Sequence, residues 1–255
     1  MGFADSDLTS DAFLGGALTI LQPAHGYRAG VDPVLLAASV PAKAGQSILE
    51  LGCGAGVASL CLDHRVAGLS IDGVEVQADY ADLATRNAEA NGQDMSVHVA
   101  DLRSLPETVK ARRFDHVIMN PPYYSRDEGT AAADPGRDAA LAGETPLEDW
   151  LSVAAKRLAP KGYLSLINDV RRLPELLTGL SGRLGGIEVL PLAARVGRAP
   201  HLVLVRARKG ARGAFRLYAP CVMHEGARHE RDGESYTQQI SAVLRDGAPL
   251  PFPTR

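Results

Sequence analysis

Short apolar runs alternate with amphipathic segments along most of the chain. Runs of apolar and β-branched residues predict buried strands at 47–51, 69–74, 95–99, 114–119 and 162–167. Helical spacing of apolar residues predicts helices between them, at 34–40, 57–64, 77–91, 145–158 and 171–183. Strands that alternate with helices predict an α/β fold with a mostly parallel sheet and helices on both faces.

The two ends of the chain follow a different pattern. Two further strands, at 186–194 and 201–207, are predicted to form a terminal pair that completes seven strands. Before the first strand, apolar residues at 13–20 are expected to pack on the sheet or form a hairpin. Asp32 and Pro33 then predict the start of a helix, with Asp32 as its N-cap. The polar segment 125–144 is expected to be a loop, and 209–255 a loop-rich tail with one helix at 237–244.

Composition is that of a globular protein, with 45% hydrophobic and 22% charged residues among 255. No apolar run approaches the roughly 20 residues that cross a bilayer, so no membrane span is expected. The odd number of cysteines, without paired spacing, favours the reducing cytoplasm. Cys221, His224 and His229 do not have the spacing of a one-face histidine pair, so no metal is expected.

Charge is distributed unevenly along the chain. Residues 1–170 carry 13 Lys and Arg against 23 Asp and Glu, whereas residues 171–255 carry 14 against 7. Between Val189 and His224 there are seven basic residues and no acidic one. This stretch fits either a surface for a polyanion or an ordinary solvated basic face.

A glycine-rich turn joins the first buried strand to a helix. Its sequence is Glu50-Leu-Gly-Cys-Gly-Ala-Gly56, and glycines allow a ligand to approach the backbone closely. A dinucleotide fingerprint needs glycine at the third place of G-x-G-x-x-G, where this chain has Val57. The acidic Glu50 would repel a phosphate and suits a cationic group instead.

Each of the next strands also ends on a polar residue. Glu75 ends the second strand, where a carboxylate can accept from both ribose hydroxyls of a nucleoside. Asp101 follows the third strand, and with Leu102 it could bracket an adenine ring. Alone, each is an ordinary strand-end residue, but their order along successive strands indicates a nucleoside site.

The fourth strand is followed by Asn120-Pro121-Pro122-Tyr123. Two prolines cannot continue a sheet ladder, so the strand must end there. An Asn-Pro turn explains the pattern without any function. The same four residues also offer amide and carbonyl acceptors for a planar –NH2 group and a ring that can stack on it.

Together these strand-end residues resemble the Rossmann-like class I S-adenosylmethionine-dependent methyltransferases, and the last four resemble enzymes that methylate a planar nitrogen. The segment GVDPVLLA at 30–37 is similar to the bacterial tRNA(Val) adenine-N6 methyltransferase family. That family modifies the adenosine just 3′ of the valine anticodon. The resemblance covers roughly residues 12–210.

The resemblance implies S-adenosylmethionine as cofactor, tRNA as substrate and one domain over 1–255. Residues 1–46 would close over the cofactor, 47–208 would form the catalytic core, and 209–255 the tail. The implied cofactor-binding residues are Tyr27, Arg28, Asp32, Glu50, Gly52, Gly54, Gly56, Glu75, Val76, Asp101, Leu102 and Asn120. The implied catalytic residues are Asn120, Pro121, Pro122 and Tyr123. The implied RNA-binding residues are Arg195, Arg198, Arg206, Arg208, Lys209 and Arg212.

Three other functions compete with this interpretation. A protein glutamine methyltransferase shares the substrate motif, but it would need a helical substrate domain in the short segment before residue 47. A guanine-N2 methyltransferase of ribosomal RNA fits the same residues. A nucleotide-binding module without catalysis is disfavoured because the substrate-side motif accompanies the cofactor-side residues.

Overall fold

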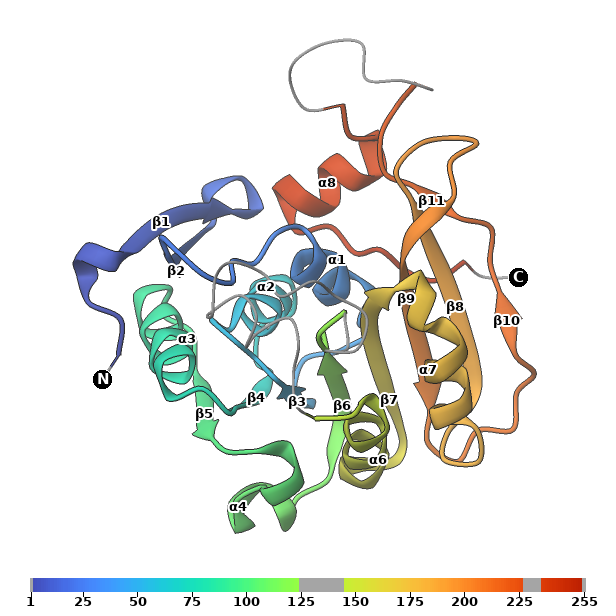
Figure 1. Cartoon of the computed structure of the whole chain (residues 1–255), viewed down its shortest axis with the longest axis horizontal. Coiled ribbons are helices and arrows are strands. Elements are labelled where there is room, and N and C mark those ends of the chain that lie inside the picture. Colours follow the sequence, from blue (N-terminus) through green and yellow to red (C-terminus); the bar gives the residue numbers. More distant parts are fainter. Residues whose placement is uncertain (1, 124–144, 227–234, 254–255) are drawn as a thin grey trace.

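A single mixed sheet forms the centre of the molecule (Figure 1). The computed structural model describes residues 2–123, 145–226 and 235–253, so the predicted loop at 125–144 and His229 lie outside the described residues. Within those ranges the strand order is β10-β8-β9-β7-β6-β3-β4-β5, and β11 also pairs with β8. The strands are β3 (Ser47–Leu51), β4 (Ser70–Glu75), β5 (Met95–Val99), β6 (Phe114–Met119), β7 (Leu158–Asp169), β8 (Gly185–Ala193), β9 (Pro200–Arg208), β10 (Arg216–Leu217) and β11 (Cys221–Val222).

Strand direction determines which residues meet at one edge. Neighbouring strands from β5 to β7 are parallel, so all of them end at the same edge, which we call the carboxyl edge. β9 runs antiparallel between β7 and β8. The predicted α/β fold with seven long strands and a terminal antiparallel strand is therefore confirmed. The two short strands β10 and β11, which lie in the tail, were not predicted.

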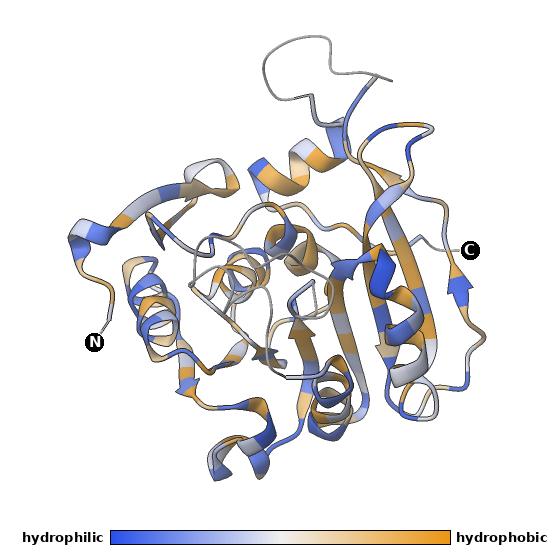
Figure 2. Cartoon of the chain, in the orientation of Figure 1, coloured by the Kyte–Doolittle hydropathy of each residue, from blue (hydrophilic) through white to orange (hydrophobic). Residues whose placement is uncertain are grey.

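Helices cover both faces of the sheet, and each face has its own core. The helices are α1 (Asp32–Ser39), α2 (Val57–Arg65), α3 (Ala78–Ala90), α4 (Glu107–Lys110), α6 (Leu147–Arg157), α7 (Leu173–Leu180) and α8 (Gln238–Asp246). In β6, Ile118 packs with α1, α2, α3 and α8, whereas Val117 and Met119 pack with α4, α6 and α7. This alternation is the period of two that a strand imposes. The central strands are accordingly largely hydrophobic (Figure 2).

Of the two arrangements expected for the N-terminal segment, the structure has the hairpin, which consists of β1 (Leu8–Phe13) and β2 (Leu18–Pro23) and lies beside α3 (Figure 1). Two asparagine amides fasten it, Asn87 in α3 and Asn91 at the C-cap of that helix. Asn87 Oδ1 accepts from the Leu21 N–H at 2.7 Å, and Asn91 Oδ1 accepts from the Thr19 N–H at 2.9 Å. Each amide also donates to the carbonyl of the same β2 residue. The side chains thus occupy backbone groups that would otherwise leave an unpaired strand edge.

The remaining described segments are short. Four 3-10 helices are η1 (Asp5–Asp7), η2 (Leu14–Gly16), η3 (Leu102–Ser104) and η5 (Val170–Arg172). The helix predicted at 171–183 is divided between η5 and α7. The tail helix α8 begins after Thr237, whose hydroxyl accepts from the Ile240 N–H as an N-cap. The prediction that Asp32 caps α1 is wrong, because Val31 occupies the cap position and no side-chain cap bond is present.

The turn after β3 gives a test of the packing. Gly52 has a φ of +66°, and a Cβ on it would lie 2.5 Å from Cη2 of Trp150. Gly54 also has a positive φ, +52°, but a Cβ there would meet nothing within 4 Å. We expect Gly54→Ala to cost about 1–2 kcal/mol of unfolding free energy from backbone strain alone. Gly52→Ala should cost about 1–3 kcal/mol more because of overpacking. Urea titrations measure both, and equal losses would contradict the contact with Trp150.

Candidate active site

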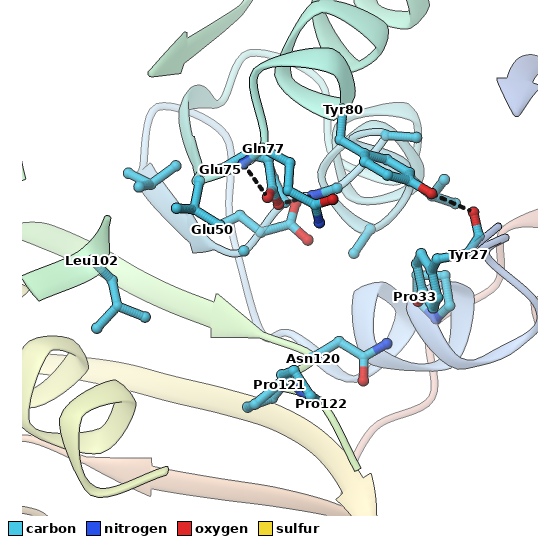
Figure 3. A pocket seen from close by; sticks show the side chains of 18 of the residues that line it. Tyr27, Pro33, Glu50, Glu75, Gln77, Tyr80, Leu102, Asn120, Pro121 and Pro122 are labelled. Carbon is cyan, nitrogen blue, oxygen red and sulfur yellow. Dashed lines mark hydrogen bonds between the residues drawn. The ribbon is translucent and has the colours of Figure 1, made fainter. Parts of the chain in front are cut away.

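A cavity of about 360 Å³ opens at the carboxyl edge. The ends of β3, β4 and β6 line it, together with the segment after β5, the loop before α1 and Trp150 of α6. In the close view, Glu50 and Glu75 lie on one side and Asn120 with its prolines on the other (Figure 3). Volume and position are those of a site for a small organic ligand.

The glycine-rich turn forms the floor beside β3. The backbone N–H groups of Gly52 and Cys53 both donate to the carbonyl of Val74, at 2.8 and 3.0 Å. This pairing ties the turn to the neighbouring strand β4. Gly52 and Gly54 line the cavity, whereas Gly56 lies outside its lining and packs its backbone against Ala84 of α3. Gly56 serves the turn into α2 as its N-cap, and its predicted role in cofactor binding stays a prediction.

Hydrogen bonds from neighbouring residues hold two carboxylates of the cavity, those of Glu50 and Glu75. Glu50 is 3% exposed, and its Oε2 accepts from both the N–H and the hydroxyl of Ser59. Glu75 is 6% exposed and accepts from the N–H groups of Gly54 and Gln77, each at 2.9 Å. Burial raises the pKa of both carboxyls, that of Glu50 to about 8.

The cavity therefore gathers acidic groups that burial holds back from ionising while no cation is bound. Asp32 is a third carboxyl in its wall, and burial raises its pKa too. Among the described lining residues, Arg103 is the one Lys or Arg, and its guanidinium is paired with Asp101 at 2.6 Å. Buried carboxylates without a cation favour a ligand that carries positive charge.

Residues that follow β4 and β5 form the side of the cavity next to these two strands. Arg103 holds the Asp101 carboxylate through its guanidinium and its backbone N–H, which lowers the pKa of Asp101. Leu102 is buried beside it, and Val76 is 63% exposed at the opening. An apolar pair beside a carboxylate is a suitable environment for the face and edge of a purine.

The substrate-side motif leaves β6 and enters the cavity from the opposite wall. The Oδ1 atom of Asn120 is buried and has no hydrogen-bond partner among the described residues. Tyr123 donates from its hydroxyl to Oδ2 of Asp32 at 2.6 Å. Asp32 thus positions Tyr123 instead of capping its helix. This pairing joins residues 91 positions apart and had no signal in the sequence.

The loop between β2 and α1 contributes one of its two predicted residues. Tyr27 lines the cavity, its carbonyl accepts from the hydroxyl of Tyr80, and burial raises the pKa of its own hydroxyl to about 12. Arg28 is not among the lining residues. Its guanidinium instead binds Asp11 and the carbonyl of Pro23, and so fastens the loop to the hairpin. The structure thus places Arg28 outside the cavity lining, and its predicted role in cofactor binding stays a prediction.

Sequence reasoning missed several lining residues, among them Gln22, Gln77, Tyr80, Thr145 and Trp150. Trp150 had a signal, because it is the single tryptophan and lies on an amphipathic helix. The others lie outside any recognisable motif.

The predicted RNA-binding residues are divided between two ends of the sheet. Arg195 and Arg198 lie in the turn between β8 and β9, and Leu202 of β9 pairs with Asp169 at the carboxyl edge. Arg208 pairs with Tyr163, six residues along the strand, which corresponds to about 20 Å. Arg206 is bound to Glu188 at 2.7 Å, Arg208 donates to the Lys161 carbonyl, and Lys209 donates to two carbonyls of α6 and β7. Arg212 is exposed at this same far end.

Neither a metal centre nor a membrane segment is found in the part of the chain that the structure describes. No group of three or more His, Cys, Asp or Glu side chains there could hold a metal ion. None of the described helices has the length and apolar character needed to cross a membrane.

Comparison with known proteins agrees with this geometry. Residues 30–189 match the family model described as methyltransferase small domain. A protein of Cronobacter sakazakii named tRNA1(Val) (adenine(37)-N6)-methyltransferase is 31% identical over 189 residues, which cover 70% of this chain and 74% of the relative. A crystal structure of a predicted O-methyltransferase from Agrobacterium tumefaciens has a TM-score of 0.70 and 26% identity, covering 88% of this chain and 100% of that one.

A more distant likeness concerns the fold alone. The T. thermophilus 16S rRNA N2 methyltransferase in complex with AdoMet and guanosine has a TM-score of 0.55 and 23% identity. The match covers 79% of this chain and 50% of that one.

Fold, cavity and comparisons define a class I methyltransferase that uses S-adenosylmethionine. The chain belongs to the methyltransferase small domain family and, within it, to the family of the bacterial tRNA1(Val) (adenine(37)-N6)-methyltransferases. The residues of the cavity fit this cofactor, because the carboxylates of Glu50 and Glu75 have no cationic partner among the described residues and suit the sulfonium and ammonium groups of the cofactor.

The raised pKa of Glu50 predicts a pH-dependent affinity for the cofactor. A cationic ligand is bound better by the ionised carboxylate, so the affinity should rise with pH towards about 8 and then level off.

The unfolding free energy of the cofactor-free protein should change with pH in the opposite sense. The pKa of Glu50 in the folded protein is above the usual value of 4.5. Its contribution to the unfolding free energy is therefore full below pH 4.5 and is lost as the pH rises through about 8. Calorimetry from pH 6 to 9 tests the affinity, and Glu50→Gln should remove most of the dependence. A pH-independent affinity in the unmodified protein would contradict this role.

The bond between Tyr123 and Asp32 predicts coupled effects of mutation. A hydrogen bond to a charged group contributes about 1.5–3 kcal/mol, so Tyr123→Phe, which removes the donor, and Asp32→Ala, which removes the acceptor, should each lower the unfolding free energy by roughly that amount. The double variant should lose no more than the worse single variant, because one interaction is removed in all three. Additive losses in denaturant titrations would show that the two residues act independently.

Proposed function

We propose that the protein methylates N6 of an adenosine in the anticodon loop of tRNA, at the position 3′ of the anticodon. The curated relatives carry this activity in their names. The observation that carries the proposal is the buried Oδ1 of Asn120, an acceptor without a partner at the wall of the cofactor cavity. An exocyclic amino group is a ligand that would satisfy it.

Residues of the chain would act on the amino group mainly by orienting it. The bound cofactor supplies a methyl group that is already activated on a sulfonium. Asn120 Oδ1 would accept one N6 hydrogen and the carbonyl of Pro121 the other, which directs the nitrogen lone pair to the methyl carbon. Alignment of this kind is proximity catalysis, and the acceptor contacts strengthen as positive charge develops on nitrogen.

Tyr123 would hold the base by stacking. A base inside a folded stem-loop must leave its stack to reach a cavity, and aromatic rings commonly receive such a base. Asp32 fixes the hydroxyl of Tyr123, so the ring is oriented before substrate arrives.

We also propose that the protein acts in the cytoplasm, where its tRNA substrate would be.

Nucleoside analysis tests this function. Unmodified tRNA is incubated with the purified protein and S-adenosylmethionine, then digested and analysed by mass spectrometry. N6-methyladenosine is the expected product, whereas N2-methylguanosine or no modified nucleoside would contradict the proposal. Asn120→Ala should lower kcat by on the order of 10²-fold with cofactor affinity nearly unchanged. Asn120→Asp keeps an acceptor and should retain more activity than Asn120→Ala.

We further propose that the RNA contacts the turn between β8 and β9. Arg195 and Arg198 lie there, at the carboxyl edge where the cavity opens, and Arg198 is exposed. The basic residues at the far end of the sheet are about 20 Å away along β9, and three of them are bound within the protein. Arg195 is itself bound to the Glu225 carbonyl and the Ser235 hydroxyl, so the exposed Arg198 is the residue of the turn that we propose for a phosphate contact.

Arg198 and Arg212 form a matched pair for testing this placement, because both are exposed arginines in the basic stretch. Arg198→Ala should weaken tRNA binding and reduce the slope of log affinity against log salt by about 0.7–0.9, the loss of one phosphate contact. Arg212→Ala should leave the slope unchanged. The reverse result in a salt titration would place the RNA at the far end of the sheet.

A further inference from the structure

Residues 120–123, the described part of the loop after β6, have few backbone donors of their own. Pro121 and Pro122 have no N–H group, so two consecutive donors are missing. Their carbonyls are nevertheless bound, and both partners come from one connection, the segment from the end of β7 into η5. The loop is therefore held from outside, by side chains.

Asn168 makes the first of these contacts. It is 0% exposed and lies next to the last residue of β7. Its Nδ2 donates to the Pro121 carbonyl at 3.0 Å, and its Oδ1 accepts from the Asp169 N–H at 2.9 Å. An amide that is bound at both ends and buried has one orientation, so its donor points in a fixed direction.

Arg172 makes the second contact. Its guanidinium donates to the Pro122 carbonyl at 3.0 Å and is itself held by both carboxylate oxygens of Glu175. The side chain is only 15% exposed. Two consecutive peptide groups of the loop are thus oriented by donors that are themselves fixed.

We propose that Asn168 is a positioning residue, which turns the Pro121 carbonyl so that its remaining lone pair faces the cavity, and that Arg172 supports the next peptide. A carbonyl oxygen has two lone pairs, and Asn168 occupies one of them. The other is the acceptor that the amino group of the substrate requires. This inference rests on the proposed function, because it assigns Asn168 to the geometry of that reaction.

The test replaces Asn168 by an isosteric group. In Asn168→Asp an ionised carboxylate cannot donate to the Pro121 carbonyl and repels it, whereas a protonated one can donate. We expect kcat on tRNA to fall about tenfold or more at pH 8, with cofactor affinity by calorimetry unchanged, since small misplacements are costly in catalysis. The ratio of variant to unmodified kcat should rise as pH falls to 6, because burial favours the protonated acid. A role confined to stability would not give that rise.

Asn87→Asp is the matched control. Asn87 is also 0% exposed and donates to two backbone carbonyls, of Leu21 and Ala55, but it does not touch the loop after β6. The Asn87→Asp variant should have a lower Tm, whereas its kcat at saturating cofactor and the pH dependence of that kcat should stay as in the unmodified protein. Arg172→Gln, at a partly exposed site, gives a second variant if Asn168→Asp fails to fold, and it should lower kcat without changing cofactor affinity.

The outcomes are distinguishable. If the unmodified protein methylates tRNA and both variants keep normal kcat with only a lower Tm, the inference is overturned and the proposed function stands. If the unmodified protein leaves adenosine in tRNA unmethylated, the proposed function is overturned and this inference with it.

Discussion

Two consecutive prolines cannot donate backbone hydrogen bonds, and the arrangement of the active site depends on that constraint. They end β6 at the carboxyl edge and leave the following residues outside the sheet ladder. The four residues from Asn120 to Tyr123 are therefore placed by contacts with other elements. Asn168 and Arg172 hold them from one side and Asp32 from the other. A loop so restrained presents its acceptors in one geometry, which is what an alignment mechanism needs.

Electrostatics adds a second constraint, since buried carboxylates destabilise the empty cavity. Glu50 and Glu75 are nearly inaccessible to water, and the hydrogen bonds from Ser59 and from backbone N–H groups offset only part of the desolvation. A cationic ligand completes the charge balance. The cavity thus favours a cationic ligand because its buried carboxylates lack a cationic partner within the part of the chain that the structure describes. Glycine-rich turns that bind phosphate have the opposite preference.

The reversal of β9 gives the sheet its functional asymmetry. Because β9 runs against β7, the turn between β8 and β9 reaches the same edge as the ends of the parallel strands, whereas the other end of β9 lies at the opposite edge. A stretch that is uniformly basic in sequence is thereby divided. Of the far-end residues, Arg206 neutralises Glu188, and Arg208 and Lys209 bind carbonyls, which explains why these three are basic without reference to RNA.

The sequence by itself determined the fold class and indicated most of the acidic and strand-end residues that line the cavity. Strand positions such as 47–51, 95–99 and 114–119 agree with the structure residue for residue, because apolar periodicity is a local property that burial in a sheet imposes. Only the tertiary structure decided which side chains serve the site. Arg28 turns to the hairpin, Gly56 to α3 and Asp32 to Tyr123, since each contact is made by residues far apart in sequence. Asn168 lies in an ordinary strand pattern, and its role depends on a carbonyl 47 positions away. No local pattern encodes such pairings, because they follow from how the strands are ordered and not from the residues that flank them.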